Sequence, residues 1–249
     1  MPLAPAPATL IGPIVLMRHG TSEFNVSGRW AGWQDVDVSP AGVLEVRRAG
    51  HRIAAAGIRV DSLHTSMLLR ARRSAAIVAA ELALPRTAVH VTWRLNERHG
   101  GALEGLTRSE MVDMIGRNAV RAFKHTEDHR PPQLDHSDFR HPRYDPLYGG
   151  VPDALLPDGE SVLDLKARVM PYWWDVIKPE LRHGSIVAIV THEHVIRLLR
   201  RHLSGCDPIK AIAPASPSMI WLDSETGLLA SETTLIDQSD PHACAPTTS

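Results

Sequence analysis

Two histidines stand directly after two short apolar runs in this sequence. His19 and its neighbour Arg18 follow the run at residues 14–17, and His192 follows the run at residues 186–190. Each run has the length and branching expected of a strand that is buried on both faces. Because ligands bind beyond the carboxyl ends of strands in open α/β sheets, we expect these three side chains to share one pocket.

This set of side chains suits a phosphoryl group. An arginine and two histidines, with helix N-termini nearby to offer backbone N–H groups, complement a dianionic phosphate better than other common substrate groups. One histidine can attack phosphorus while the other hydrogen-bonds the equatorial oxygens and the arginine holds the developing charge. The residues alone therefore predict phosphoryl transfer through a phosphohistidine.

Helical signals separate the two runs. Ser39 followed by Pro40 predicts the start of a helix whose apolar stripe ends at Gly57. Ser66 is expected to cap a second helix, which would run through an alanine-rich stretch to Leu84. Both helices would pack against the strands that precede and follow them.

Two more helices are expected in the second half of the chain. Ser161 and Asp164 have the spacing of a capping box, and a last helix is predicted from about residue 194 to 203, with Gly205 beyond its end. Strands that alternate with helices predict an α/β fold. We expect a three-layer sandwich, in which helices cover both faces of a mostly parallel sheet.

A long segment interrupts this alternation. Residues 125–160 contain six prolines and many turn residues, which is long for a connection inside a compact domain. We interpret it as part of a lid insertion at about 108–160 within a single domain at 13–238. The small, polar or proline-rich ends, 1–12 and 239–249, are predicted to be disordered tails.

Six segments form a longer pattern along the chain. They are L-M-R-H-G-T-S-E-F-N at 16–25, G-W-Q-D-V-D-V-S-P-A-G at 32–42, T-S-M-L-L-R-A-R-R-S at 65–74, W-R-L-N-E-R-H at 93–99, G-E-S at 159–161 and V-T-H at 190–192. In this order they resemble the histidine phosphatase superfamily, and in particular its cofactor-dependent phosphoglycerate mutases, across residues 14–223. The resemblance implies a phosphoglycerate-mutase-like fold with a cap insertion.

The resemblance also implies catalytic roles for five residues. His19 would be the nucleophile that becomes phosphorylated, and Arg18 and Arg70 would grip the phosphoryl oxygens. His192 would stabilise the transferring group, and Glu97 would be the general acid and base. A carboxylate does that work near neutral pH when its pKa is raised, and we expect burial under the lid to raise the pKa of Glu97.

A further group of positions is expected to contact the substrate or its phosphate. They are Asn25, Gly32, Arg98, Arg108, Lys124, His125, Glu193 and His194. Several depart from the family pattern. Glu193 and His194 stand where mutases have a glycine and an asparagine, and Gly100 stands where they have a tyrosine. The chemistry of phosphoryl transfer is thus expected to be intact, while the identity of the substrate is open.

Two reactions are compatible with this pattern. The long lid and the cations retained at Arg98, Arg108 and Lys124 favour a mutase, which the sequence leads us to expect. Gly100 and the changes after His192 favour a histidine-type phosphatase, or a mutase with another substrate. A mutase would need 2,3-bisphosphoglycerate or a similar phosphoryl donor as a primer, and we expect no other cofactor and no metal.

Other classes of function are less well supported. A metal hydrolase with His19, His192 and His194 as ligands would rest on an H-x-H spacing that is common by chance, without an accompanying acidic motif. A silent module that only binds phosphorylated metabolites would have had no reason to keep His19, Arg18, Arg70, Glu97 and His192 together.

Composition narrows the partners. The 27 Lys and Arg against 28 Asp and Glu give a net charge of -1, so no broad basic field predicts a nucleic acid or an anionic membrane as partner. No apolar run approaches the roughly 18 to 20 residues that span a bilayer, and the N-terminus does not resemble a signal peptide. We expect a cytoplasmic enzyme of a small phosphorylated metabolite, and a homodimer is possible.

Overall fold

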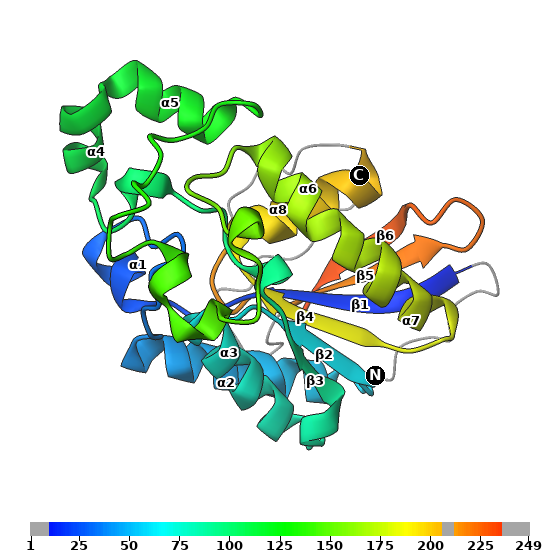
Figure 1. The fold of residues 1–249 in the computed structure, drawn as a ribbon. Helices are drawn as coiled ribbons and strands as arrows, with labels where there is room; N and C mark the ends of the chain where they lie inside the picture. The colour runs from blue at the N-terminus through cyan, green and yellow to red at the C-terminus, as the bar shows by residue number, and fades with distance from the viewer. Residues whose placement is uncertain (1–9, 206–211, 236–249) are drawn as a thin grey trace.

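The two apolar runs lie side by side at the centre of one sheet in the computed structural model, which describes residues 10–205 and 212–235 (Figure 1). The described strands are Leu10–Arg18 (β1), Ser62–Thr65 (β2), Val89–Val91 (β3), Val187–Thr191 (β4), Ser218–Asp223 (β5) and Leu229–Thr234 (β6). They pair in the order β3-β2-β4-β1-β5-β6. Only the pairs β1–β5 and β5–β6 are antiparallel, which confirms the expected mostly parallel sheet.

Helices cover both faces of this sheet, as Figure 1 shows. The helices next to the sheet are Pro40–Ala55 (α2) and Leu69–Glu81 (α3) on one face, and Val162–Tyr172 (α6), Lys178–Arg182 (α7) and Glu193–Ser204 (α8) on the other. Alternate residues of β1 supply the two cores: Val15 packs in the cluster beneath α2 and α3, whereas Leu16 packs in the cluster beneath α6 and α8. The predicted three-layer sandwich is confirmed.

Most of the expected helix ends are where the sequence placed them. The Ser39 hydroxyl accepts the Gly42 N–H at 3.0 Å and caps α2, and Ser161 forms the predicted capping box with Asp164 at the start of α6. Helix α8 ends at Gly205, which has a left-handed backbone conformation. The prediction for Ser66 was wrong, because α3 begins three residues later, at Leu69, and the Ser66 hydroxyl contacts His192 instead.

The predicted lid contains two helices followed by irregular chain. The helices are Arg108–Ile115 (α4) and Arg117–His125 (α5), which stand apart from the sheet in Figure 1. After them come only short turns of 3₁₀ helix, Pro142–Tyr144, Pro146–Tyr148 and Asp153–Leu155. Tyr148 stacks on Trp33 with ring centres 5.0 Å apart, and Leu156 joins the same cluster. This cluster fixes the end of the insertion to the segment that follows His19.

The remaining regular elements are short. They are Glu23–Ser27 (α1), the 3₁₀ turns Arg86–Ala88, Trp93–Leu95 and Gly101–Leu103, and a π-helical segment at Trp173–Ile177. The π-helical segment follows Pro171, whose missing N–H interrupts the regular pattern of helix α6.

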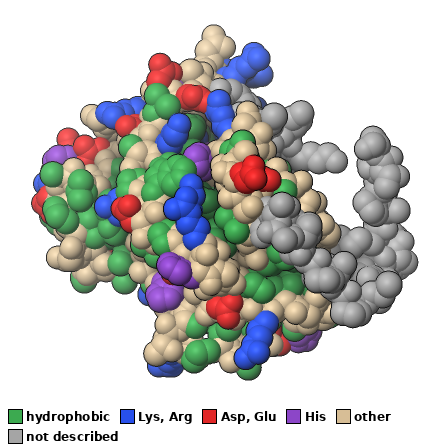
Figure 2. Space-filling view, turned by 90° about the vertical axis from the view of Figure 1, so that its right-hand side faces the viewer, with side chains coloured by type: hydrophobic (Ala, Val, Ile, Leu, Met, Phe, Trp, Pro, Cys, Tyr) green, Lys and Arg blue, Asp and Glu red, His purple; other side chains and the backbone are tan. Residues whose placement is uncertain are grey.

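The amino end of the fold lies earlier than expected. Strand β1 begins at Leu10, inside the range 1–12 that was predicted to be a tail, because Leu10 and Ile11 pair with Asp223 and Leu222 of β5. The rest of that range and all of 239–249 lie outside the described residues. Among the helices of the described residues, none has the length and apolar character needed to cross a membrane. On the face that Figure 2 shows, basic and acidic side chains are interspersed with hydrophobic ones.

Candidate active site

The two histidines meet at the carboxyl edge of the sheet. His19 follows β1 and His192 follows β4, and their ring centres are 5.1 Å apart. The His19 backbone N–H donates to the Thr191 carbonyl at 2.9 Å, so the parallel pairing of the two strands sets this spacing. His19 is 3% exposed and His192 is fully buried. The predicted pair is therefore brought together in an enclosed site.

The contacts of His19 leave one ring nitrogen ready to react. Nδ1 lies 2.7 Å from the Gly20 carbonyl, which can only accept, so Nδ1 carries the proton and Nε2 carries the lone pair. Burial lowers the pKa of His19 to about 3, and the charges of Arg70 and Arg18 act in the same direction. His19 is thus a neutral imidazole at physiological pH, which is the nucleophilic form.

His192 presents a proton rather than a lone pair. The Ser66 Oγ accepts the Leu68 N–H at 3.2 Å, and its own hydrogen is available for His192 Nε2, 2.7 Å away. This arrangement puts the ring proton on Nδ1, which is buried and has no partner among the described residues. Burial and the Arg70 charge hold the pKa of His192 well below its usual value. A buried N–H without an acceptor beside His19 is suited to a phosphoryl oxygen.

Arg70 is a buried cation that no described carboxylate pairs. It is 1% exposed, and its guanidinium donates to the Gly32 carbonyl at 2.7 Å and the Gln34 carbonyl at 3.0 Å. Gly32 has a φ of 52°, and a side chain there would overlap the Glu104 carboxylate. Burial lowers the pKa of Arg70 to about 10, so it stays charged near pH 7. A buried charge of this kind favours an anionic ligand.

Arg18 is held by a residue that the sequence assigned to the substrate. Its Nη1 donates to Glu193 Oε2 at 2.8 Å and to the Ile212 carbonyl at 2.8 Å. Glu193 is the first residue of α8, directly after His192. The structure thus places Glu193 on Arg18, the arginine that is expected to bind the phosphoryl oxygens.

The expectation for the pKa of Glu97 was wrong in direction. Burial does raise the pKa of this carboxyl, but the contact with His194, together with the Arg98 N–H, holds it well below its usual value. His194 Nδ1 lies 3.2 Å from Glu97 Oε1, and the Arg98 N–H donates to the same oxygen at 2.8 Å. The stretch after His192 therefore supplies Glu97 with a partner that favours the ionised carboxylate.

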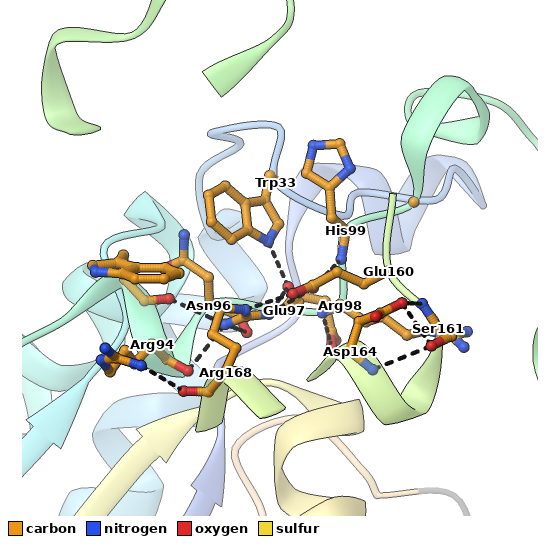
Figure 3. A network of polar contacts seen from close by, with 12 residues as sticks. Trp33, Arg94, Asn96, Glu97, Arg98, His99, Glu160, Ser161, Asp164 and Arg168 are labelled. Carbon is orange, nitrogen blue, oxygen red and sulfur yellow. Dashed lines mark hydrogen bonds and ion pairs between the residues drawn. The ribbon is translucent and has the colours of Figure 1, made fainter. Parts of the chain in front are cut away.

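A buried ion pair that sequence reasoning missed positions Glu97 (Figure 3). The Arg168 guanidinium binds both carboxylate oxygens of Glu160 at 2.7 Å and donates to the Glu97 carbonyl at 3.1 Å. Trp33 Nε1 donates to that same carbonyl at 2.6 Å. A signal was present in the sequence: Arg168 lies three residues after Leu165 and next to Val169, on the apolar face of α6.

The other predicted substrate residues differ in how they are placed. Arg98 is fully buried, with its Nε unpartnered among the described residues. Lys124 stands 5.9 Å from the centre of the Trp30 ring, and Arg108 is exposed at the start of α4. The Asn25 Oδ1 accepts from Ser22 at the start of α1, which leaves its amide NH₂ for a ligand. His125 ends α5, and its side chain lies outside the described part of the structure.

A cleft of about 600 Å³ lies next to this site and is lined in part by Glu193 and His194. Trp30, Lys124, Glu193 and His194 line the part next to Glu97 and Arg18, and residues of α6 and α8 line the remainder. Through Glu193 and His194 the cleft borders the enclosed centre. We expect this cleft to hold the nonreacting part of a substrate.

The described histidines do not gather around His19 as metal ligands would. The described residues contain one group of at least three donors close enough for a shared ion, which is His136, His141 and Asp158 in the insertion. His141 Nδ1 accepts the Arg143 N–H at 3.2 Å, so Nε2 holds the proton that it donates to Asp158 at 2.7 Å. These contacts form a hydrogen-bonded cluster, and they leave no lone pair on His141 for a metal.

Comparisons with known proteins agree with this geometry. The model of the histidine phosphatase superfamily (branch 1) matches residues 14–227. A 2,3-bisphosphoglycerate-dependent phosphoglycerate mutase of Nitratidesulfovibrio vulgaris is 43% identical over 194 residues, which are 78% of each chain. The enzyme of that name from Thermobifida fusca is 40% identical over 200 residues, covering 80% of this chain and 81% of its own.

Solved structures agree on the fold. A mycobacterial glucosyl-3-phosphoglycerate phosphatase superposes with a TM-score of 0.67 at 22% identity, over 90% of this chain and 96% of that chain. Bacillus stearothermophilus YhfR gives a TM-score of 0.65 at 24% identity, over 88% and 94%. The paired histidines, the buried arginine and these matches lead to one conclusion: the chain belongs to branch 1 of the histidine phosphatase superfamily and is an enzyme of the phosphoglycerate-mutase type.

Proposed function

We propose that this enzyme interconverts 2-phosphoglycerate and 3-phosphoglycerate through a phosphohistidine at His19. The observation that carries the proposal is the setting of Glu97, whose carboxylate lies 3.2 Å from His194 Nδ1 and accepts the Arg98 N–H at 2.8 Å, two contacts that favour its ionised form. A mutase starts its cycle from the phosphorylated histidine, so its first need is a base that takes a proton from the substrate hydroxyl. An ionised carboxylate meets that need. The names of the relatives from Nitratidesulfovibrio vulgaris and Thermobifida fusca support the same substrate.

The first transfer adds a phosphoryl group to the substrate. The substrate hydroxyl attacks the phosphorus of phospho-His19, a P–O bond forms, the P–N bond to Nε2 breaks, and the hydroxyl proton passes to Glu97. The Nδ1 proton of His192 and the guanidinium of Arg70 bind the equatorial oxygens as charge spreads over them. Arg18 contributes to the same grip once it leaves Glu193.

The second transfer removes the other phosphoryl group. After the intermediate turns in the site, His19 Nε2 attacks the second phosphorus, the P–O bond breaks, and Glu97 returns its proton to the leaving oxygen. The contact between Nδ1 and the Gly20 carbonyl keeps the lone pair of Nε2 directed for this attack. Enclosure of the site slows the competing attack of water on phospho-His19.

We also propose that 2,3-bisphosphoglycerate primes the enzyme. It would supply the phosphoryl group that loads His19, and the unpartnered donors of His192 and Arg98, together with the buried charge of Arg70, fit a ligand with more than one anionic group. The proposal includes no metal and no organic cofactor. A cytoplasmic location and a homodimer remain predictions, which cell fractionation and sedimentation analysis can test.

Phosphorus NMR tests the proposed reaction directly. The purified enzyme is mixed with 3-phosphoglycerate and a trace of 2,3-bisphosphoglycerate, and a growing 2-phosphoglycerate signal is the expected result. Inorganic phosphate without 2-phosphoglycerate would replace the mutase by a phosphatase. The His19→Ala variant is expected to lose all phosphoryl transfer, and turnover near the wild-type rate in that variant would refute the role of His19.

A further inference from the structure

Trp30 occupies the space that a side chain at position 100 would need. If Gly100 carried a Cβ, that atom would lie 2.6 Å from Trp30 Nε1 and 2.8 Å from Cδ1. Both distances are well inside van der Waals contact, so the indole at position 30 requires glycine at position 100. Gly100 stands where the resemblance leads one to expect a tyrosine, and in this chain the indole of Trp30 lies where the Cβ of such a residue would be.

The indole N–H is a buried donor with nothing to donate to. Trp30 Nε1 is shielded from solvent and has no hydrogen-bond partner among the described residues. Burying an N–H group without an acceptor is unfavourable, and folded proteins seldom leave one unpaired. The ring itself is firmly packed, with Phe123 at 5.1 Å and His194 at 5.4 Å between ring centres. The donor is therefore held in place in advance of any ligand.

Two cations lie over the ring that carries this donor. The Arg98 guanidinium lies 5.7 Å from the Trp30 ring centre and the Lys124 ammonium lies 5.9 Å from it. Arg98 is fully buried, has an unpartnered Nε, and forms no ion pair with any carboxylate in the part of the chain that the structure describes. The Trp30 N–H, the buried Arg98 guanidinium and the Lys124 ammonium together form a site for an anion.

The donor lies where the nonreacting part of a substrate would sit. Trp30, Lys124 and His194 line the cleft of about 600 Å³ together, and His194 contacts Glu97 at 3.2 Å. An anionic group near Trp30 would thus be close to the acid–base residue while the phosphoryl group is at His19.

We propose that Trp30 is a specificity-determining residue whose indole N–H binds the substrate's nonreacting carboxylate. The proposal rests on the proposed function, because phosphoglycerate supplies that carboxylate. It predicts that the enzyme distinguishes a phosphorylated hydroxy acid from a phosphorylated alcohol of the same size through Trp30 and its neighbours, rather than through the residues around His19.

The test compares two phosphoryl donors in the full-length enzyme. Trp30→Phe keeps a ring but removes the N–H, and Trp174→Phe is the matched control because Trp174 is exposed and packs against Lys178. The rate of His19 phosphorylation is measured by intact-protein mass with 3-phosphoglycerate and with glycerol 3-phosphate, which lacks the carboxylate. The assay contains no 2,3-bisphosphoglycerate, so that each donor must phosphorylate His19 itself.

We expect a selective loss in Trp30→Phe. The rate constant at low donor concentration with 3-phosphoglycerate should fall by about ten- to a hundredfold, which is the size of one hydrogen bond to a charged group. The rate with glycerol 3-phosphate should change by less than about threefold, and Trp174→Phe should leave both rates unchanged. Equal loss with both donors, or no loss with either, overturns the proposal.

A second variant tests whether the effect of Trp30→Phe comes from the lost N–H or only from altered packing of the ring. Gly100→Ala suits the backbone angles at that position, and its Cβ displaces the indole, so the same selective loss is expected. The double variant Trp30→Phe with Gly100→Ala should lose little more than either single variant, because both act on one contact. Additive losses would overturn the assignment of the effect to the indole N–H.

The arms of the experiment separate the two proposals. If the wild type fails to interconvert the phosphoglycerates by NMR but Trp30→Phe still loses its preference for the carboxylate-bearing donor, the proposed function is wrong and the role of Trp30 stands. If inhibition by inorganic phosphate weakens in Trp30→Phe as much as inhibition by glycerate, the indole binds a second phosphate and the carboxylate assignment is refuted.

Discussion

Replacing Arg168 by methionine should strongly destabilise the fold, because the ion pair with Glu160 is buried on both sides. The two side chains are 5% and 4% exposed. Removing one partner of a buried pair leaves an uncompensated charge and costs about 3–5 kcal/mol. In the wild type, Arg168 Nη1 donates to the Arg94 carbonyl at 2.9 Å and to the Asn96 carbonyl at 3.1 Å. Loss of these two hydrogen bonds adds about 1–2 kcal/mol to the cost. We expect a total of roughly 4–7 kcal/mol.

That loss is a large share of the stability of an ordinary domain, which is about 5–15 kcal/mol. For a domain of this size each kcal/mol lowers the melting temperature by about 2–4 °C, so Arg168→Met should melt roughly 8–28 °C below the wild type. Arg130→Met is the matched control. Arg130 also binds a carboxylate through two nitrogens, at 2.7 and 2.6 Å from Asp164, but its side chain is 56% exposed. An exposed pair contributes about 0–1 kcal/mol.

Calorimetry and urea unfolding of the two variants decide the matter. Equal melting temperatures for Arg168→Met and Arg130→Met would refute the reasoning from burial. A functional readout tests whether Arg168 positions Glu97, as its contact with the Glu97 carbonyl suggests. Arg168→Lys should slow transfer from 3-phosphoglycerate, whose leaving oxygen needs a proton, far more than transfer from an aryl phosphate with a good leaving group. A merely destabilised enzyme would slow both equally.

Three further outcomes are expected. His194→Asn should raise the pKa of Glu97 by removing its partner, so the acidic limb of kcat/KM against pH moves to higher pH; an unmoved limb would show that the contact has no effect. Because the folded protein lowers the pKa of both His19 and His192, protons bind the unfolded state preferentially below about pH 6.5, and these two groups should lower the free energy of unfolding by up to about 2.7 kcal/mol per pH unit toward pH 5. His19→Asn should make the slope shallower by about 1.4 kcal/mol per pH unit in urea titrations, and an unchanged slope would contradict it. Gly32→Ala should reduce phosphoryl transfer at least about tenfold, because the new methyl group would overlap Glu104 and move the Gly32 carbonyl that binds Arg70. Wild-type kinetics in this variant would contradict the prediction.

The parts of the fold that local chemistry determines were predictable from the sequence. Ser39 and Ser161 cap helices because the residues after them continue a helical pattern, and the two apolar runs are strands because their length and branching allow little else. Ser66 has the same cap chemistry, but its hydroxyl contacts a histidine 126 residues away. Such a choice depends on tertiary structure, which a local pattern does not contain.

The candidate site divides in the same way. The positions of His19, His192 and Arg70 followed from motifs and from strand ends. The pKa of Glu97 did not, because its direction depends on the contact with His194, which the fold creates. The sequence also did not predict that Trp30 lies against Gly100. A glycine at position 100 indicates only that a side chain is missing, and not which other side chain fills the space.

The start of α8 shows how two substitutions can retune a site without altering its reacting atoms. Glu193 binds Arg18, so an incoming phosphoryl group has to displace a carboxylate before it gains that arginine. Within the described residues no carboxylate pairs with Arg70, and the backbone carbonyls of Gly32 and Gln34 hold its guanidinium in position. The affinity for phosphate therefore rests on Arg70, while Glu193 weakens binding through Arg18. Weaker product binding speeds release, which suits the proposed interconversion, because both phosphoglycerates would have to enter and leave the same enclosed centre.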